Sequence, residues 1–247
     1  MEIFQNDPKV ILYAILGGFV PTIFWLWFWL KHEDREEPEP VGLIAISFVI
    51  GALMVIVAIW LEKMSLGIVG GNDQARIILW AAIEEILKFL GISIVIFGNK
   101  NINQPIDYPV YFMVTALGFA AFENILYLIN PISTEGALSG MFTGGLRFLG
   151  STLLHSIASA MIGSALGLSF YLKKYQKTYL LVGIIFAITL HSIFNFFIMK
   201  SSDKNFLSVF GFLWVVTIIN ILVFEKLKRM AKYLPIQKNN YEEKIIF

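Results

Sequence analysis

Ionisable side chains interrupt several segments of this chain that are otherwise almost entirely apolar. In the stretch "LWAAIEEILKFLGISIVIF", from Leu79 to Phe97, three such residues stand in the middle. An ionisable group at the centre of a bilayer costs roughly 2.5–3.5 kcal/mol on insertion scales, and in a membrane helix it indicates a functional site by default. The residues of this kind, with their amide neighbours, are Glu84, Glu85, Lys88, Glu123, Asn124, His155, His191 and Asn195.

These residue types suit the hydrolysis of a bond by an activated water. A glutamate held away from bulk water can act as a general base near neutral pH, and Glu84 and Glu85 are the candidates. The second glutamate or a histidine would return the proton to the leaving amine. Asn195, one turn after His191, would stabilise the developing oxyanion. Lys88 follows Glu84 by four residues on the same helix face, so we expect it to keep that carboxylate ionised.

The composition indicates that these segments lie in lipid. The chain has 247 residues, of which 57% are apolar and 15% are charged, whereas about 25% are charged in soluble domains. The net charge of +1, with no basic patch interleaved with aromatics, argues against nucleic-acid binding. The absence of Cys excludes disulfides, cysteine-ligated metals and a thiol nucleophile. The N-terminus lacks the pattern of a removable signal peptide, so we expect its apolar segment to be retained as a helix.

Seven segments have the length and apolarity to cross a bilayer, which needs roughly 20 residues per helix. The sequence therefore predicts an all-α, polytopic membrane bundle that forms a single domain. Helix-breaking residues mark the connections: Pro38 with Pro40, Gly70 with Gly71, Pro105, and Pro131 followed by Gly136. The predicted spans are about 10–30, 41–61, 76–97, 108–130, 144–172, 179–199 and 206–225, with 226–247 as a cytoplasmic tail.

The distribution of basic residues predicts the orientation, because cytoplasmic loops carry an excess of Lys and Arg. An odd number of spans places the two termini on opposite sides. Twelve basic residues fall on the side of the C-terminus and five on the other, which predicts an external N-terminus and a cytoplasmic C-terminus. The twelve are Lys31, Arg35, Lys100, Lys173, Lys174, Lys177, Lys226, Lys228, Arg229, Lys232, Lys238 and Lys244, and the five are Lys9, Lys63, Arg76, Lys200 and Lys204.

The polar positions of spans three to six share one depth. Counted from the outer end of its span at 1.5 Å per residue, each lies roughly 10–17 Å below the outer surface. The residues compared are Glu84, Glu123, His155 and His191. Small residues at Ser151, Ser159, Gly163 and Gly167 flank His155 on one face, and such stripes let helices approach closely. We therefore expect one polar cavity open to the outside, supported by Lys88, Asn124 and Ser159.

Most other mechanisms of membrane proteases require residues or motifs that this sequence lacks. A His-Glu-x-x-His motif is absent, every Asp lies in a loop or tail, and no Gly-x-Ser-x-Gly element accompanies the serines near His155. A metal site remains open: His155, His191 and one glutamate, for which we take Glu123, would form a three-ligand zinc site with a free fourth position. Each residue alone also has a structural interpretation, as a buried ion pair or an interhelical hydrogen bond.

Two rival functions use the same residues. A proton-coupled transporter or channel could relay protons along glutamates and histidines, although no inverted repeat or pair of broken helices is visible in the sequence. A non-catalytic membrane scaffold would tolerate substitution at every polar position. Transport also predicts an acidic route that continues to the cytoplasmic side, whereas the inner halves of spans three to six are apolar, and the shared depth of the polar residues favours a functional site over a scaffold.

Five motifs of the sequence resemble, in order, those of the PrsW family. They are "DREEPEP" after the first span, "EEILK" (Glu84, Glu85, Lys88), "FAAFEN" (Phe119, Glu123, Asn124), "HSIASAMIG" (His155, Ser159, Gly163) and "HSIFN" (His191, Asn195). The resemblance extends from about residue 30 to 200. Each motif is weak alone, but the combination is specific.

The resemblance implies a membrane-embedded protease that cleaves a membrane-anchored protein. The family is typified by site-1 cleavage of an anti-sigma factor, and it is distantly related to the type II CAAX prenyl endopeptidases. The catalytic candidates that it implies are Glu84, Glu85, Glu123, His155 and His191, with Asn195 as the oxyanion or positioning group. The partners expected are a membrane-anchored protein or peptide and the lipid bilayer.

Overall fold

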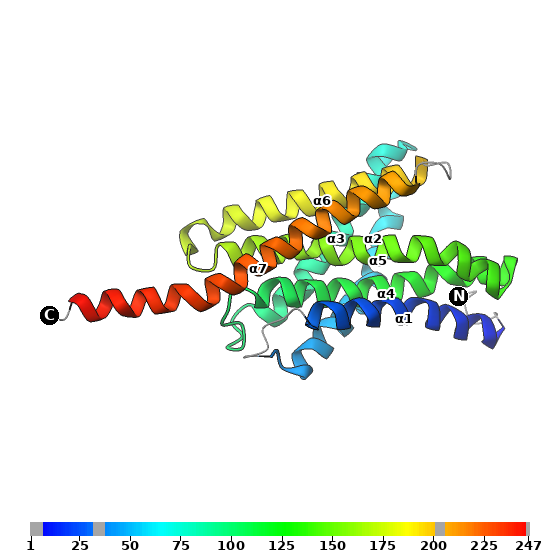
Figure 1. Cartoon of the computed structure of the whole chain (residues 1–247). Coiled ribbons are helices and arrows are strands. Elements are labelled where there is room, and N and C mark those ends of the chain that lie inside the picture. The colour runs from blue at the N-terminus through cyan, green and yellow to red at the C-terminus, as the bar shows by residue number, and fades with distance from the viewer. Residues whose placement is uncertain (1–6, 32–37, 201–205, 246–247) are drawn as a thin grey trace.

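The chain forms a bundle of long helices in the computed structural model, which describes residues 7–31, 38–200 and 206–245 (Figure 1). The described residues contain no strand, so the predicted helical membrane bundle is confirmed. Its elements are α1 (Pro8–Lys31), α2 (Val41–Val69), α3 (Asp73–Ile96), α4 (Asp107–Glu135), α5 (Ala137–Leu168), the short 3₁₀-helix η2 (Lys173–Tyr175), α6 (Gln176–Lys200) and α7 (Phe206–Ile245).

Every long helix except α3 contains a segment that is long and apolar enough to cross a membrane, which makes six candidate spans among the described residues. α3 carries Arg76 and the trio Glu84, Glu85 and Lys88, so its composition does not meet that standard. The trio is buried inside the bundle, however. The outward side of α3 is apolar, with Ile86, Leu90 and Ile94 among its exposed side chains.

The helix ends follow local capping chemistry. α2 follows Pro40 and ends at Gly70, whose φ of 55° is the left-handed conformation that favours glycine. Asn72 then begins α3, since its side chain accepts hydrogen bonds from the backbone N–H groups of Gln74 and Ala75. Pro131, predicted to mark a connection, lies inside α4 instead, and the chain turns at Gly136 with a φ of 86°.

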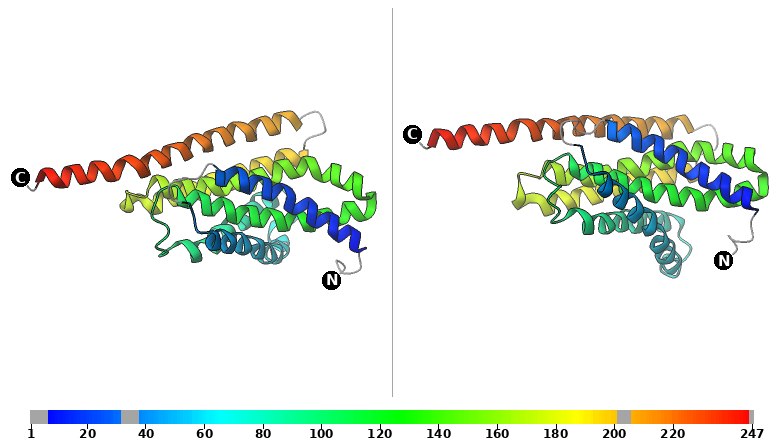
Figure 2. Two further views of the ribbon diagram at one scale, coloured as in Figure 1. Left: turned by 60° about the horizontal axis from the view of Figure 1, so that its bottom comes forward. Right: turned by 90° about the horizontal axis from the view of Figure 1, so that it is seen from below.

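Some helices continue past their predicted spans. α2 runs to Val69 rather than residue 61, and α5 begins at Ala137 rather than residue 144. α7 continues to Ile245, so most of the predicted tail is helical, and this part of α7 extends beyond the other helices (Figures 1 and 2). The predicted acidic loop after the first span, including Arg35, lies outside the described residues up to residue 37.

Five helices close a ring. α2 packs against α3 and α4, α6 packs against α3 and α5, and α4 packs against α5. α1 covers α4 and α5 from outside the ring, and α7 lies along α5. Figure 2 shows α7 on one side of the bundle and α2 with α3 on the opposite side. The first half of α4 is fully enclosed, because every residue from Asp107 to Ala121 is buried.

α2 and α4 cross at two glycines. A Cβ added to Gly51 would lie 1.9 Å from the carbonyl oxygen of Thr115, and one added to Gly118 would lie 1.9 Å from that of Phe48. Neither position has room for a side chain, so the two backbones are in direct contact. This contact fixes the position of α2 against the rest of the ring.

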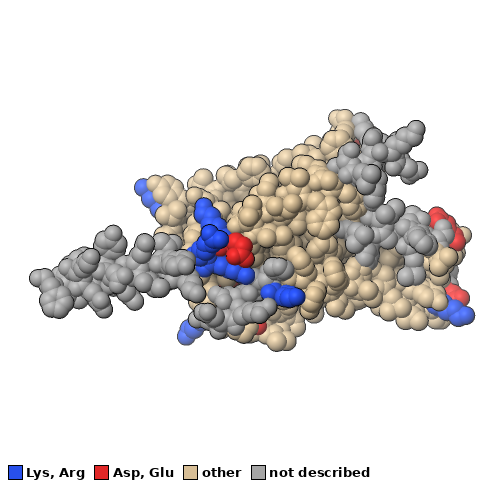
Figure 3. Space-filling model, in the orientation of Figure 1, with Lys and Arg blue, Asp and Glu red and all other residues tan. Residues whose placement is uncertain are grey.

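The charged side chains gather at the ends of the bundle. Figure 3 shows a wide uncharged middle, with most of the visible Lys and Arg at the end from which α7 emerges. The basic residues in the helices and loops of that end include Lys31, Lys173, Lys174, Lys226, Lys228 and Arg229. This separation of apolar middle and charged ends is typical of a chain that spans a bilayer.

We predict that Gly118→Ala destabilises the bundle. The added methyl group would overlap a backbone carbonyl that cannot move without shifting α2, and overpacking of this kind costs about 1–3 kcal/mol or more. Thermal unfolding of the detergent-solubilised protein measures the effect. Gly67→Ala is the matched control, because a Cβ there meets nothing within 4 Å. Equal melting temperatures for the two variants would contradict the close crossing.

Candidate active site

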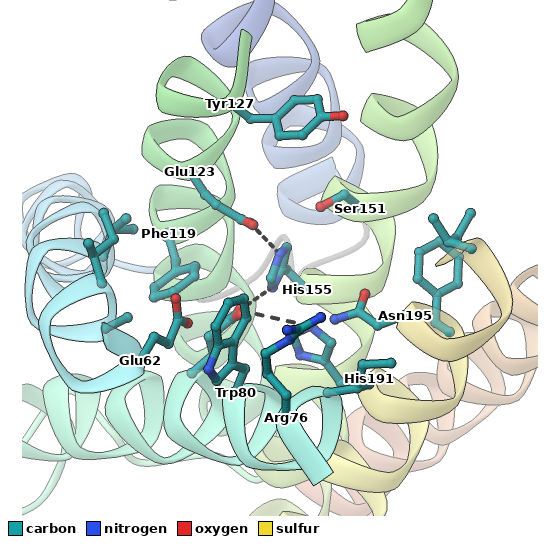
Figure 4. A pocket seen from close by; sticks show the side chains of 17 residues that line it. Glu62, Arg76, Trp80, Phe119, Glu123, Tyr127, Ser151, His155, His191 and Asn195 are labelled. Carbon is teal, nitrogen blue, oxygen red and sulfur yellow. Dashed lines mark hydrogen bonds and ion pairs between the residues drawn. The ribbon is translucent and has the colours of Figure 1, made fainter. Parts of the chain in front are cut away.

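Three of the predicted residues bring electron-donating atoms to one point inside the ring. Glu84 comes from α3, His155 from α5 and His191 from α6. Oε2 of Glu84 lies 3.7 Å from Nδ1 of His155 and 3.9 Å from Nε2 of His191. The two imidazole rings meet edge to face, with centroids 5.0 Å apart. Residues more than a hundred positions apart in the sequence therefore form one cluster (Figure 4).

The hydrogen bonds of His155 identify its tautomer. Nζ of Lys88 lies 3.0 Å from Nδ1, and Oε2 of Glu123 lies 2.8 Å from Nε2. An ammonium group can only donate, so Nδ1 must accept and carries no proton. The ring proton is then on Nε2 and is donated to the carboxylate of Glu123.

His191 is oriented by a second carboxylate. Its Nδ1 lies 2.8 Å from Oε1 of Glu85, so Nδ1–H donates and the lone pair is on Nε2, which faces Glu84. Oε2 of Glu85 accepts a hydrogen bond of 3.2 Å from the Ser159 hydroxyl. Ser159 therefore supports the cluster by holding the carboxylate that holds His191.

Lys88 forms its closest ion pair with Glu85, although its charge also acts on Glu84, the carboxylate that it was predicted to keep ionised. Its Nζ lies 2.5 Å from Oε1 of Glu85 and 4.9 Å from the centroid of the Phe119 ring. Residues three apart on a helix also share a face, and the inward direction of α3 falls between Glu84 and Glu85. Glu85 is fully buried, with both oxygens engaged. Its place is behind the histidines rather than in the pocket.

The carboxylate of Glu84 is different, because its Oε2 is buried and makes no hydrogen bond. This oxygen and the unprotonated nitrogens of two histidines belong to a group whose donor atoms all lie within 4.8 Å of one another. Nδ1 of His155 accepts from the ammonium of Lys88, but Oε2 of Glu84 has no hydrogen-bond donor, and a cation bound among the three electron-rich atoms would offset their mutual repulsion. Two His and one carboxylate are a common ligand set for catalytic zinc, so the residues fit a metal ion.

Glu123, the predicted metal carboxylate, stands on the other side of His155. It contacts Nε2 of the ring, whereas the cluster of donor atoms gathers at Nδ1. A carboxylate that accepts the outer N–H of a metal-binding histidine orients the ring and increases its basicity. The geometry thus gives Glu84 the ligand position and Glu123 an outer one, although the side chain of Glu123 remains 27% exposed to the pocket.

The two predicted amides differ in their surroundings. Asn124 is buried and donates a hydrogen bond of 3.0 Å to the Thr152 hydroxyl, which joins α4 to α5 away from the cluster. Asn195 lines the pocket one turn after His191. Figure 4 shows its side chain directed toward the two histidines. The position of Asn195 suits contact with a substrate, and that of Asn124 suits packing.

A pocket of about 450 Å³ opens above the cluster and is lined by all five helices of the ring. Sequence reasoning did not assign five of its polar and aromatic lining residues to the site: Glu62, Arg76, Trp80, Tyr127 and Ser151. Glu62 was missed because α2 was expected to end before it. Its spacing from Val55, Ala58 and Ile59, which also line the pocket, is a helical-face pattern that could have found it.

We predict that Glu85→Gln destabilises the protein by about 3–5 kcal/mol, because it leaves the ammonium of Lys88 buried without its counter-ion. The double variant Glu85→Gln with Lys88→Met should recover most of this loss, since no uncompensated charge remains. Thermal unfolding in detergent gives both values. As a control, Glu225→Gln removes an exposed partner 3.7 Å from Lys228, and it should cost less than about 1 kcal/mol. A double variant no more stable than Glu85→Gln alone would contradict the pairing.

Comparison with known proteins places the chain among membrane proteases. Residues 39–223 match the family described as "PrsW family intramembrane metalloprotease". No solved structure matches the chain. Among curated relatives, Protease PrsW of Bacillus subtilis (strain 168) is 28% identical over 86% of this chain and 91% of its own length.

Two further relatives carry the same name. Protease PrsW of Clostridioides difficile (strain 630) is 24% identical over 94% of both chains. That of Geobacillus kaustophilus (strain HTA426) is 26% identical over 75% of this chain and 79% of its own length. The family match covers most of the chain and includes the three helices that carry the cluster. This chain belongs to the PrsW family of intramembrane metalloproteases.

Proposed function

We propose that this protein hydrolyses a peptide bond of a membrane-anchored protein in the pocket above Glu84, His155 and His191. The observation that carries the proposal is the buried, unpartnered Oε2 of Glu84, which faces two unprotonated imidazole nitrogens. Glu84, His155 and His191 would together hold a divalent cation, and zinc suits this set of donors. When bound, zinc supplies a Lewis acid that polarises the scissile carbonyl and favours ionisation of water.

The protein's own groups prepare the ligands. Glu123 and Glu85 each accept the outer N–H of one histidine, which keeps both imidazoles neutral and fixes their rotation. Lys88 would give up its contact with Nδ1 of His155 to a bound cation and keep Glu85 as its counter-ion. Proteins that lose such outer partners typically lose 10–100-fold in metal affinity or activity.

Proton transfer falls to a carboxylate that the substrate can reach. Glu85 is fully buried and outside the pocket wall, so it acts as a positioning residue. Glu123 lines the pocket and stands beside the cluster, so its carboxylate would take a proton from the attacking water and return it to the leaving amine. Asn195 would donate its amide N–H to the oxyanion that forms on the carbonyl. The division of roles differs from that expected from the sequence, in which Glu84 or Glu85 was the base.

The surroundings of the cluster favour access from one side of the membrane. On the inner side, buried apolar residues of the ring fill the interior: Ile92, Ile96, Phe112, Met113, Leu117, Ile162 and Leu166. The pocket lies on the other side, toward the turns at Gly70 and Gly136. With most basic residues at the opposite end of the bundle, this arrangement supports a pocket on the outer side and a C-terminus in the cytoplasm.

The substrate class follows from this position. A pocket enclosed by membrane helices and open to the outer face is reached by a chain that is itself tethered to the membrane. The family resemblance extends this to an extracytoplasmic segment of an anti-sigma factor, cleaved at site 1. A proton-coupled transporter would need a continuous polar route to the opposite face, and the buried residues described on that side of the cluster are mainly apolar, with Thr115 and Ser164 among the exceptions.

We predict that two isosteric variants distinguish the glutamate that binds the metal from the glutamate that acts as the general base. Glu84→Gln should lose both bound metal and cleavage, because an amide oxygen is a weaker ligand than a carboxylate. Glu123→Gln should keep metal near the wild-type content and lose about 10²–10⁴-fold in kcat. Elemental analysis of the purified protein and cleavage of a membrane-anchored reporter in detergent provide the two measurements.

Glu225→Gln serves as the control, because its side chain is exposed on α7 far along the chain from the pocket. Wild-type protein without stoichiometric metal, and with cleavage that resists chelators, would contradict the ligand assignment. Full activity in Glu123→Gln would contradict its role as the base.

We also predict that residues at the pocket end of the bundle face the exterior. The chain has no Cys, so a single introduced thiol can be labelled without background. Ser133→Cys near the end of α4 should react with a membrane-impermeant maleimide in intact cells, and Lys174→Cys in η2 should react only after lysis. The reverse pattern would invert the orientation.

A further inference from the structure

We propose that the pocket binds a basic side chain of the substrate close to the scissile bond, and that Glu62 and Trp80 form the subsite for it. The inference deepens the function proposed above and rests on it. The chemistry recognised is an alkylammonium or guanidinium group carried by an aliphatic stem. Both residues line the pocket, Glu62 from α2 and Trp80 from α3, and Figure 4 shows the carboxylate of Glu62 directed into it.

Glu62 differs from the other charged residues of the pocket wall because, within the described ranges, no hydrogen bond or ion pair holds its carboxylate. Arg76 forms an ion pair of 2.7 Å with Asp73. Glu123 accepts a hydrogen bond from His155, and Glu84 faces the two histidines of the proposed metal site. The charge of Glu62 thus has no role in the cluster and no counter-ion in the described wall.

The surroundings of Glu62 are unfavourable for a lone charge. Its side chain is only partly exposed, and the residues one turn before it on α2, Ala58 and Ile59, are apolar pocket-lining groups. The carboxylate also lies close enough to that of Glu123 for the two negative charges to repel. A cation placed between them would relieve this repulsion, and a substrate can supply one.

The position of Glu62 is fixed by a hydrogen-bonded link between α2 and α3. The Ser65 hydroxyl donates to the backbone carbonyl of Glu62 at 2.7 Å and accepts from Nε1–H of Trp80 at 3.1 Å. The indole ring is therefore held beside the turn that carries the carboxylate. The guanidinium carbon of Arg76 lies 5.6 Å from the ring centroid, so this indole already packs against one cation.

A carboxylate and an aromatic wall together are suited to a basic side chain. The carboxylate pairs with the charged end, and the ring packs against the methylene stem and attracts the cation through its quadrupole. Because the indole of Trp80 and the backbone at Glu62 are already held in place, only the side chain of Glu62 has to be ordered in the subsite when the basic side chain binds. The subsite would set which segment of a tethered chain lies across the cluster.

A panel of membrane-anchored reporters tests the proposal. Each carries one membrane helix and a short extracytoplasmic segment with Lys, Met or Glu at successive positions around the cleaved bond. For wild-type protein in detergent, Lys at one position should raise kcat/KM by about 10-fold to 100-fold over Met, and Glu there should lower it. Glu62→Gln should remove most of this difference. Glu62→Lys should invert it, so that the Glu reporter becomes the best substrate.

Two controls keep the result specific. Lys63→Glu makes the opposite charge change one residue away on an exposed side chain, and it should leave the preference for Lys intact. Thermal unfolding of the Glu62 variants should match wild type, which separates lost recognition from lost structure. Cleavage by wild type without charge preference, or preference retained in Glu62→Gln, overturns the subsite and leaves the protease function standing. Cleavage of no reporter by wild type overturns the proposed function and this inference with it.

Discussion

The structure of the site depends on one fully buried charge, the carboxylate of Glu85. Inside a bundle with little water, an ionised group must have all of its acceptor capacity used, because an unpaired charge there costs several kcal/mol. Lys88 of α3, Ser159 of α5 and His191 of α6 together meet this requirement. The same contacts bring three helices to one axial register and turn the imidazole of His191 toward Glu84. The ion pair of Glu85 with Lys88 also places the ammonium against His155, so the charge controls the orientation of both histidines.

This arrangement divides the acidic residues by their position around the histidines rather than by type. Glu85 and Glu123 stand behind the rings and accept their outer N–H groups, whereas Glu84 stands in front with an oxygen that has no hydrogen bond. The result is one carboxylate oxygen and two neutral imidazole nitrogens that face one point. The close crossing of α2 and α4 at Gly51 and Gly118 completes the enclosure, because it brings the wall that carries Glu62 against the ring.

The sequence predicted the depth of the site residues along their helices, but it did not predict the directions in which their side chains point. The axial rise of a helix is constant, so counting residues from the span ends predicted one level for Glu84, His155 and His191, and the structure brings these three side chains together. Whether Glu84 or Glu85 meets Lys88 depends on the rotation of α3 about its axis, and this is set by packing against α5 and α6 rather than by spacing. The position of Glu123 behind His155 is a matter of side-chain rotamers. Glu62 was missed because α2 continues beyond the apolar run that defined its predicted span. The family motifs identified most of the cluster, but they did not show which member faces the substrate.

The apolar filling beneath the cluster has a consequence for the cell that contains this protein. Glutamates and histidines inside a membrane can relay protons. A continuous chain of such groups from one face to the other would dissipate the electrochemical gradient across the bilayer. In the described part of the bundle, Ile92, Phe112 and Leu117 are buried apolar residues on the side of the cluster away from the pocket. An interior of this kind would oppose proton leakage from the acid–base groups of the site to the opposite face of the membrane.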